Sequence, residues 1–238
     1  MLDQILDSPF NIGIETLLLL AILVALETVL SADNAIALAA ISGGLENSKR
    51  QHQALNLGLV VAFILRVTLI LTATWVTRFW QFELLGAAYL LWLVFQYFTS
   101  EEDAQHHHHG PRFSSLWQAI PAIALTDLAF SLDSVTTAIA VSDETWLVLV
   151  GGAIGIIALR FMAELFIRWL QEFTHLEDAG YLTVALVGVR LLLRVVSADL
   201  VPPQWLMILG IAIIFTWGFS KRATDSRECL SSPDLAED

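Results

Sequence analysis

The sequence predicts an all-α, polytopic membrane protein with about seven transmembrane helices. Two observations on composition support this fold class. Of the 238 residues, 56% are hydrophobic and only 15% are charged, and the mean hydropathy is +0.68. A soluble domain of this length is far less apolar. A third observation, a polar motif that occurs twice in otherwise apolar segments, divides the helices into two inverted three-helix repeats plus one further helix.

The apolar residues are gathered in runs whose length suits a helical span of roughly 20 residues. The first run is longer than a span requires, so we expect it to be tilted, or broken near residues 31–34. The expected spans are residues 14–41, 55–75, 84–98, 117–141, 146–170, 181–196 and 205–219. The corresponding organisation is an extracytoplasmic segment (1–13), repeat one (14–98), a His-rich cytoplasmic loop (99–116), repeat two (117–198), a seventh helix (199–219) and a cytoplasmic tail (220–238).

Charge and cysteine content exclude some functions. The formal net charge of −12 argues against binding of nucleic acid, and the acids of the tail and the connecting loops are typical of solvated surface. The single cysteine, Cys229, lies in the polar tail, so an intramolecular disulfide or a zinc site built from cysteines is excluded.

The basic residues predict the orientation of this multi-pass integral membrane protein. Seven spans place the two termini on opposite sides of the membrane. One side then carries Arg78 alone, and the other carries Lys49, Arg50, Arg112, Arg168, Lys221, Arg222 and Arg227. The positive-inside rule puts the N-terminus outside and the C-terminus in the cytoplasm. The sequence does not distinguish a plasma or inner membrane from a thylakoid membrane.

One stretch of the first span carries polar groups that are costly in lipid. Glu27, Ser31, Asp33 and Asn34 interrupt the apolar run of residues 16–41. A carboxylate in the middle of a span costs about 2.5–3.5 kcal/mol on insertion scales, so such residues usually mark an ion or substrate path. The same pattern recurs 100 residues further on, at Asp127, Ser131, Asp133 and Ser134.

Further matches extend the repeat beyond this motif. Three pairs are separated by 94 residues: Gly58 and Gly152, Arg66 and Arg160, and Gly86 and Gly180. Because each repeat contains three spans, an odd number, the two copies must cross the membrane in opposite directions. Transporters built from such inverted repeats bind their substrate near the midplane, at the interface between the repeats.

Helical geometry leaves two arrangements open for the four motif acids. At about 100° per residue, Glu27, Ser31 and Asn34 lie within roughly 60° of one another, whereas Asp33 lies about 120° away. Either both motif helices unwind locally, so that all four acids converge, or Asp33 and Asp133 serve a second face of their helices. Ser and Asp side chains compete for backbone hydrogen bonds, which favours local unwinding.

Four carboxylates in a low-dielectric site need positive charge nearby. The candidates are a divalent cation, shared protons, or Arg66 and Arg160, which we interpret as counter-charges or gating groups. A metal that displaces protons on arrival gives metal/proton antiport. Arg160 also has Glu164 one turn away as a local partner. Arg190 and Arg194 are expected to line the inner rim of the sixth span or to extend to the interface.

The donor atoms narrow the identity of the ion. The expected ligands carry oxygen donors: Glu27, Asp33, Asn34, Asp127, Asp133, Ser31, Ser131 and Ser134. Such donors favour hard cations such as Mn²⁺, Mg²⁺ and Ca²⁺, whereas Zn²⁺ and Cu⁺ favour imidazole and sulfur. The spans contain neither His nor Cys. The metal is therefore expected as cargo, with no permanently bound cofactor. The cytoplasmic loop contains four consecutive histidines, His106, His107, His108 and His109. They either capture metal on the cytoplasmic side or belong to a mobile polar segment without such a role.

At these residues the sequence resembles the TerC family of multi-pass membrane proteins, which is related to metal exporters of the lysine-exporter type. The resemblance rests on Glu27-x-x-x-Ser31-x-Asp33-Asn34 and Asp127-x-x-x-Ser131-x-Asp133-Ser134, and the seven-helix layout of the family covers residues 14–219. It implies export of Mn²⁺ from the cytoplasm, with the acids of both motifs as ligands. Composition and spacing alone leave Ca²⁺ and Mg²⁺ open.

The competing hypothesis is a non-transporting protein that acts in membrane-protein biogenesis, or in tellurite or metal stress resistance, through a partner. In that case Glu27 and Asp127 pair with Arg66 and Arg160 only to hold the helices together. An enzyme is not expected, because no His or Cys lies near the two motif serines. The expected partners are a divalent metal ion and membrane lipid, and the sequence leaves a homo-oligomer open.

Overall fold

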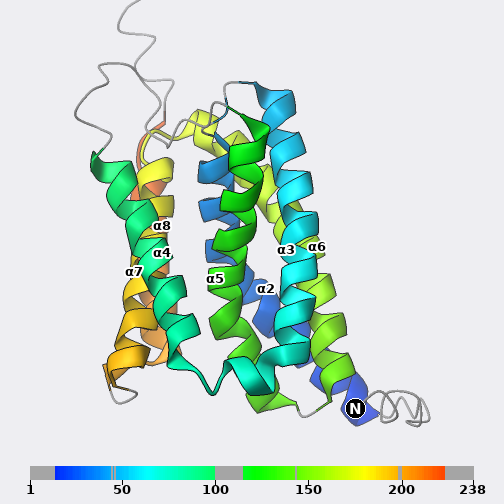
Figure 1. Ribbon diagram of the computed structural model, residues 1–238. Coiled ribbons are helices and arrows are strands. Elements are labelled where there is room, and N and C mark those ends of the chain that lie inside the picture. The colour runs from blue at the N-terminus through cyan, green and yellow to red at the C-terminus, as the bar shows by residue number, and fades with distance from the viewer. Residues whose placement is uncertain are drawn as a thin grey trace, which may run out of the picture.

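The computed structural model describes residues 14–43, 45, 47–99, 115–142, 144–197 and 200–222, and these residues form an all-helical bundle (Figure 1). Its helices are α2 (Ile14–Gly43), α3 (Ser48–Val76), α4 (Trp80–Thr99), α5 (Leu116–Val141), α6 (Thr145–Glu172), α7 (Leu176–Val196) and α8 (Gln204–Gly218). By length and composition, the helices α3 to α7 can each cross a membrane. The predicted class, an all-α polytopic membrane protein, is confirmed.

Successive helices run in opposite directions through the bundle (Figure 1). The connections at residues 77–79, 142–144 and 173–175 contain three residues each, so the helices they join must return alongside one another. We call the end of the bundle where α4 begins the Trp80 end. The opposite end, where α5 begins, is the Trp117 end. The N-terminus of α2 lies at the Trp80 end.

The packing of the helices follows a pseudo-two-fold symmetry. The most extensive contacts pair α2 with α6, α3 with α5, and α4 with α7. Exchanging the first three helices for α5, α6 and α7 converts the α2/α6 pair into the α5/α3 pair and maps the α4/α7 pair onto itself. Each member of repeat one therefore packs mainly against repeat two, as inverted repeats do in transporters. The predicted site, at the interface of the repeats, lies between these pairs.

Small residues allow the paired helices to approach closely. A Cβ atom on Gly58 of α3 would lie 2.6 Å from Cγ2 of Ile123 in α5, so this position accepts no side chain without movement. Close backbone approach at glycine is a common device of helix packing in membranes.

The last helix, α8, covers only one of the two repeats. The ring centroid of its Phe215 lies 5.7 Å from that of Phe166 in α6, and the helix also packs along α7. The chain that follows α8 returns to the α6–α7 connection. The backbone N–H of Thr174 donates to the carbonyl of Lys221, and Phe173 and Arg222 form an isolated antiparallel β-bridge. Repeat one has no equivalent cover among the described residues.

Of the two arrangements left open by the sequence, the favoured one, local unwinding, is wrong, because α2 and α5 are continuous through both motifs. The hydroxyls that were expected to disrupt the helices instead donate to carbonyls one turn earlier. Ser131 Oγ lies 2.6 Å from the carbonyl oxygen of Asp127, and Thr137 Oγ1 lies 2.9 Å from that of Asp133. A carbonyl has two lone pairs, so it accepts this bond beside the helical one.

Candidate functional site

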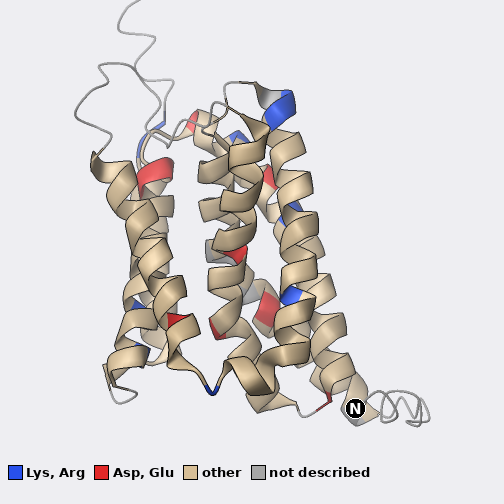
Figure 2. Ribbon diagram, viewed as in Figure 1, with Lys and Arg blue, Asp and Glu red and all other residues tan. Residues whose placement is uncertain are grey.

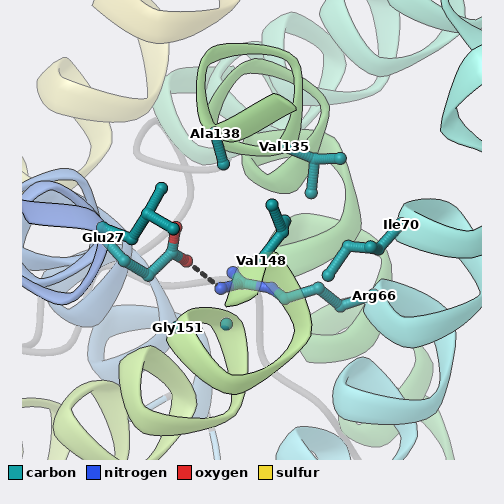
Figure 3. A pocket seen from close by; sticks show the side chains of 9 residues that line it. Glu27, Arg66, Ile70, Val135, Ala138, Val148 and Gly151 are labelled. Carbon is teal, nitrogen blue, oxygen red and sulfur yellow. Dashed lines mark hydrogen bonds and ion pairs between the residues drawn. The ribbon is translucent and has the colours of Figure 1, made fainter. Parts of the chain in front are cut away.

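Arg66 of α3 is the centre of a buried cluster of charges. Its guanidinium donates from Nη1 to the carboxylate of Glu27 in α2. It also donates from Nη2 to Oδ1 of Asp127 in α5, at a distance of 3.2 Å. Arg66 is 1% exposed, and both carboxylates are buried. Figure 2 shows that charged positions lie along the middle of the helices as well as at their ends, and Figure 3 shows the carboxylate of Glu27 directed at Arg66. The cluster therefore joins the two motif helices through one arginine.

The charges of this cluster do not balance. Two carboxylates face one guanidinium, and within the described part of the chain no other Lys, Arg or His lies within 4 Å of either acid. With both acids ionised, one negative charge remains without a partner inside the membrane. Burying an unpaired charge costs several kcal/mol, so the cluster favours a further positive charge, either a cation or a proton.

Hydroxyl groups of both motifs surround the acids. Ser131 Oγ lies 3.4 Å from Asp127 Oδ2, and the buried Ser134 donates from its Oγ to the carbonyl of Ser131 at 3.5 Å. Ser31 is fully buried one turn from Glu27, and its Oγ has no hydrogen-bond partner among the described residues. Asn34, two turns from Glu27, is also buried. An unsatisfied buried hydroxyl costs about 1–3 kcal/mol, so Ser31 Oγ is a donor atom that is free to take a ligand.

A small cavity lies beside the Glu27–Arg66 ion pair. Its volume is about 10 Å³, which is room for roughly one water molecule. In Figure 3, Ile70, Val135 and Val148 close around it. Arg66 lines this cavity, and its Nε atom is buried without a partner in the described structure. The cluster thus keeps one donor that the two carboxylates do not use.

Asp133 belongs to a second cluster, nearer the Trp80 end. Arg190 of α7 donates to Asp133 Oδ2, and Nη1 of Arg194 lies 2.9 Å from Asp133 Oδ1. Arg194 Nη1 also lies 3.7 Å from Glu83 Oε1, at the start of α4. Two arginines and two carboxylates balance in charge. The network connects α5, α7 and α4 close to where α7 ends.

The described motif acids do not converge on a single site as predicted. Because α5 is a continuous helix, Asp133 faces about 120° away from Asp127, and it reaches α7 instead of α3. No three side chains of His, Cys, Asp or Glu gather as a metal site in the described residues. Asp33 is part of α2, but its side chain lies outside what the structure describes, as do all of His106, His107, His108 and His109.

Only one of the two predicted counter-charges lies at the acids. Arg160 turns to Glu164, at 2.7 Å from Oε2, and both side chains are about one-third exposed. The position that follows Arg66 by four residues is Ile70, which offers no carboxylate. Arg66 therefore takes its partners from α2 and α5, whereas Arg160 is satisfied within α6.

Sequence reasoning did not assign Glu83, Arg190 and Arg194 to the site. Arg190 and Arg194 were expected to line the inner rim of the sixth span or to extend to the interface, and their contacts with Asp133 were not predicted. A signal for this pairing existed: the two arginines are four residues apart, and therefore on one face of a span. Gly155 was not assigned to the site either, and a Cβ at this position would lie 2.2 Å from Cγ of Glu27.

Comparison with known proteins places this arrangement among membrane proteins. Residues 12–226 match the family model described as integral membrane protein TerC family. The uncharacterized membrane protein YceF of Bacillus subtilis is 33% identical over 80% of this chain and 75% of its own length. The UPF0053 inner membrane protein YgdQ of Escherichia coli K12 is 30% identical over 82% of this chain and 90% of its own length. The thylakoid membrane protein TERC of Arabidopsis thaliana is 28% identical over 60% of this chain and 45% of its own length. No solved structure matches the chain.

Proposed function

Because the chain belongs to the integral membrane protein TerC family, we propose that it is a transporter that exports a hard divalent cation, Mn²⁺, from the cytoplasm. The observation that carries this proposal is the unbalanced charge of the Glu27–Arg66–Asp127 cluster. A structural ion pair needs one acid for one arginine, whereas this cluster holds two acids from pseudo-equivalent positions of the two repeats. The extra acid is available to a cation.

The donor set supports a hard cation as the cargo. Glu27 and Asp127 offer carboxylate oxygens, and the buried Ser31, Ser131 and Ser134 offer hydroxyls one to two turns away on the same two helices. Oxygen-only sites suit Mn²⁺, Mg²⁺ and Ca²⁺. Asn34, Asp33 and Asp133 complete the proposed ligands: Asp133 joins once the arginines of α7 release it. The cation is cargo, and we propose neither a resident cofactor nor an enzymatic activity.

Arginine exchange is the mechanism that we propose for loading. In the arrangement described, Arg66 occupies the carboxylates that a cation would bind. A divalent cation carries twice the charge of a guanidinium, so it competes for these oxygens when it arrives. A proton on Glu27 or Asp127 neutralises the surplus charge after the metal has left. Export by exchange with protons follows from these two states.

The second cluster suggests how one side of the path is held closed. We propose that the Trp80 end is extracytoplasmic, as the basic residues predict, so that the Asp133–Arg194–Glu83 network lies towards the outside. The positions equivalent to Arg190 and Arg194 in repeat one, by the offset of 94 residues, are Gln96 and Ser100. The Trp117 end therefore lacks this arginine pair, and the outer side alone is held by it.

Purified protein in liposomes tests the proposal. Glu27→Gln and Asp127→Asn each remove one carboxylate of the cluster, and each should lower Mn²⁺ flux at least tenfold. Glu164→Gln is the matched control, because it removes a carboxylate that binds an arginine on the exposed side of α6. Full flux in both cluster variants would overturn the proposal and favour a non-transporting membrane protein. Parallel assays with Ca²⁺ and Mg²⁺ decide which hard ion is carried.

A further inference from the structure

An apolar groove opens between α3 and α4 of the first repeat and α5 of the second. Its volume is about 370 Å³, and its walls include Leu69, Leu85 and Leu128. The hydroxyls on its walls are already used: Thr72 Oγ1 donates to the carbonyl of Thr68 at 2.7 Å, and Tyr89 Oη donates to that of Ala122. The groove therefore offers hydrocarbon contacts and no free donor to a polar ligand.

The pseudo-equivalent surface of the second repeat is covered by α8. The offset of 94 residues relates three residues of the groove to three in repeat two: Thr72 to Phe166, Phe82 to Leu176, and Leu85 to Ala179. Phe166 contacts the ring of Phe215, and the backbone of Gly218 approaches both Leu176 and Ala179. The members in repeat two are all buried, whereas Leu85 is 67% exposed. The same surface is thus sealed once and left open once.

A helix in the groove of the first repeat could not approach α4 as closely as α8 approaches α7. In repeat two the approach depends on two small residues, since a Cβ on Gly218 would lie 2.8 Å from Cβ of Ala179. The equivalent of Ala179 is the bulky Leu85, and the equivalent of Leu176 is Phe82. Close helix packing in membranes needs small residues at the contact. A flexible hydrocarbon chain has no such requirement.

A second copy of this chain does not supply an equivalent helix either. The pseudo-two-fold relation inverts direction, so a helix in the groove that matched α8 would have to run from the Trp117 end to the Trp80 end. In α8 the chain runs the other way (Figure 1). A second molecule inserted with the same orientation presents its α8 in the wrong direction.

We propose that the groove is a binding site for one acyl chain of a membrane phospholipid, which occupies in repeat one the place that α8 occupies in repeat two. The chain lies against Leu128 and Leu132 of α5, the helix that carries Asp127 and Asp133. The lipid therefore contacts the back of a motif helix and completes the packing of α3 and α4 around it.

Photolabelling of the full chain in phosphatidylcholine vesicles tests this site. The probe is a phosphatidylcholine with a diazirine in the middle of one acyl chain, and adducts are mapped by mass spectrometry. Leu128 in the groove and Ile64 on the open face of α3 lie at similar depth, 13 and 12 residues from the Trp80 end of their helices. Ile64 is 59% exposed and Leu128 is only partly exposed. Bound lipid should nevertheless label Leu128 at least threefold more than Ile64.

Groove-filling variants provide the second arm. Thr72→Phe introduces the residue that repeat two carries at Phe166, and it should lower labelling of Leu128 at least threefold. Ile64→Phe is the matched control outside the groove and should leave that labelling unchanged. Thr72→Leu gives the same direction of change with a smaller side chain, should the larger one prevent folding. Labelling of Leu128 no stronger than that of Ile64, or unaffected by filling the groove, would overturn the proposal. A photo-cross-link from position 85 to a polypeptide in native membranes would assign the groove to a partner helix instead.

Discussion

Gly155 of α6 leaves the space that the Glu27 side chain of α2 occupies. A Cβ on Gly155 would lie 2.2 Å from Cγ and 3.2 Å from Cδ of Glu27. The acid reaches Arg66 across the α2/α6 contact only because this position carries no side chain. The place of the carboxylate is therefore set from both repeats, by the glycine of one and the motif helix of the other.

The first prediction concerns this contact. Gly155→Ala should displace Glu27, lower the free energy of unfolding by about 1–3 kcal/mol through overpacking, and reduce Mn²⁺ flux. Gly152→Ala, one turn earlier, is the control. Its Cβ would meet Ile70 Cδ1 at 3.5 Å, an ordinary contact, and alanine favours a helix by about 1 kcal/mol over glycine. Thermal unfolding in detergent and liposome flux measure both effects. Unchanged flux in Gly155→Ala would show that Glu27 needs no fixed position.

The second prediction concerns the buried arginine. Arg66→Met leaves two buried carboxylates without their partner and should lower the free energy of unfolding by about 3–5 kcal/mol. Adding Glu27→Gln should recover part of this loss, because one uncompensated acid is removed. Arg160→Met is the control and should cost about 1 kcal/mol or less, since its ion pair is partly exposed. Thermal unfolding of the four proteins gives the comparison. Equal losses for the two arginines would contradict the central role of Arg66.

The third prediction separates the two acids of the second cluster. Asp133→Asn removes the carboxylate that accepts a hydrogen bond from Arg190 and forms an ion pair with Arg194, and should cost about 1.5–3 kcal/mol of stability. Glu83→Gln removes one contact of 3.7 Å between partly exposed groups and should cost below about 1 kcal/mol. A double-mutant cycle of Asp133→Asn with Arg194→Gln measures the coupling between them. A coupling energy near zero would mean that Arg194 does not hold Asp133 in solution.

The fourth prediction addresses exchange with protons. If a proton replaces the departing metal on Glu27 or Asp127, Mn²⁺ that moves into the liposome should drive protons out of it. A pH-sensitive dye inside the vesicles reports this movement. Asp127→Asn should abolish the proton signal together with metal flux, whereas Glu164→Gln should retain both. Metal flux without any proton signal in the unaltered protein would exclude antiport and leave transport itself standing.

The fifth prediction uses two stacked tyrosines at the Trp117 end. Tyr97 and Tyr181 stack with ring centroids 3.8 Å apart, but among the described residues only the hydroxyl of Tyr97 has a hydrogen-bond partner, donating to Asp178 Oδ1 at 2.5 Å. Tyr97→Phe should therefore cost about 1–2 kcal/mol of stability. Tyr181→Phe is the matched control. Its buried hydroxyl has no hydrogen-bond partner in the described residues, so its removal should be neutral or stabilising. The reverse order of the two unfolding midpoints would contradict this assignment.

Several features of the site could be read from residue types and spacing. Glu27 and Asp127 were predicted to lie together between the repeats, and both contact Arg66, with Ser131 beside Asp127. The pairing of Arg160 with Glu164 was also foreseen, because residues four apart on a helix meet without help from the rest of the fold. The division of the acids into two clusters was not. It depends on whether α5 unwinds, and α5 is a continuous helix in which the hydroxyls of Ser131 and Thr137 bond to carbonyls of the same helix.

The sequence by itself determined the membrane class, the duplicated polar motif and the position of each helix, although α3 starts seven residues and α7 five residues earlier than expected. These are local properties, since hydropathy and helical period depend on neighbours along the chain. Only the tertiary structure decided that Arg66 and not Arg160 reaches the buried acids, that Asp133 binds α7, and that α8 seals one repeat and leaves the other open. Those outcomes depend on the phase and separation of helices far apart in the chain. Local patterns point to only part of them: Glu164 lies four residues after Arg160, and Arg190 and Arg194 are four residues apart.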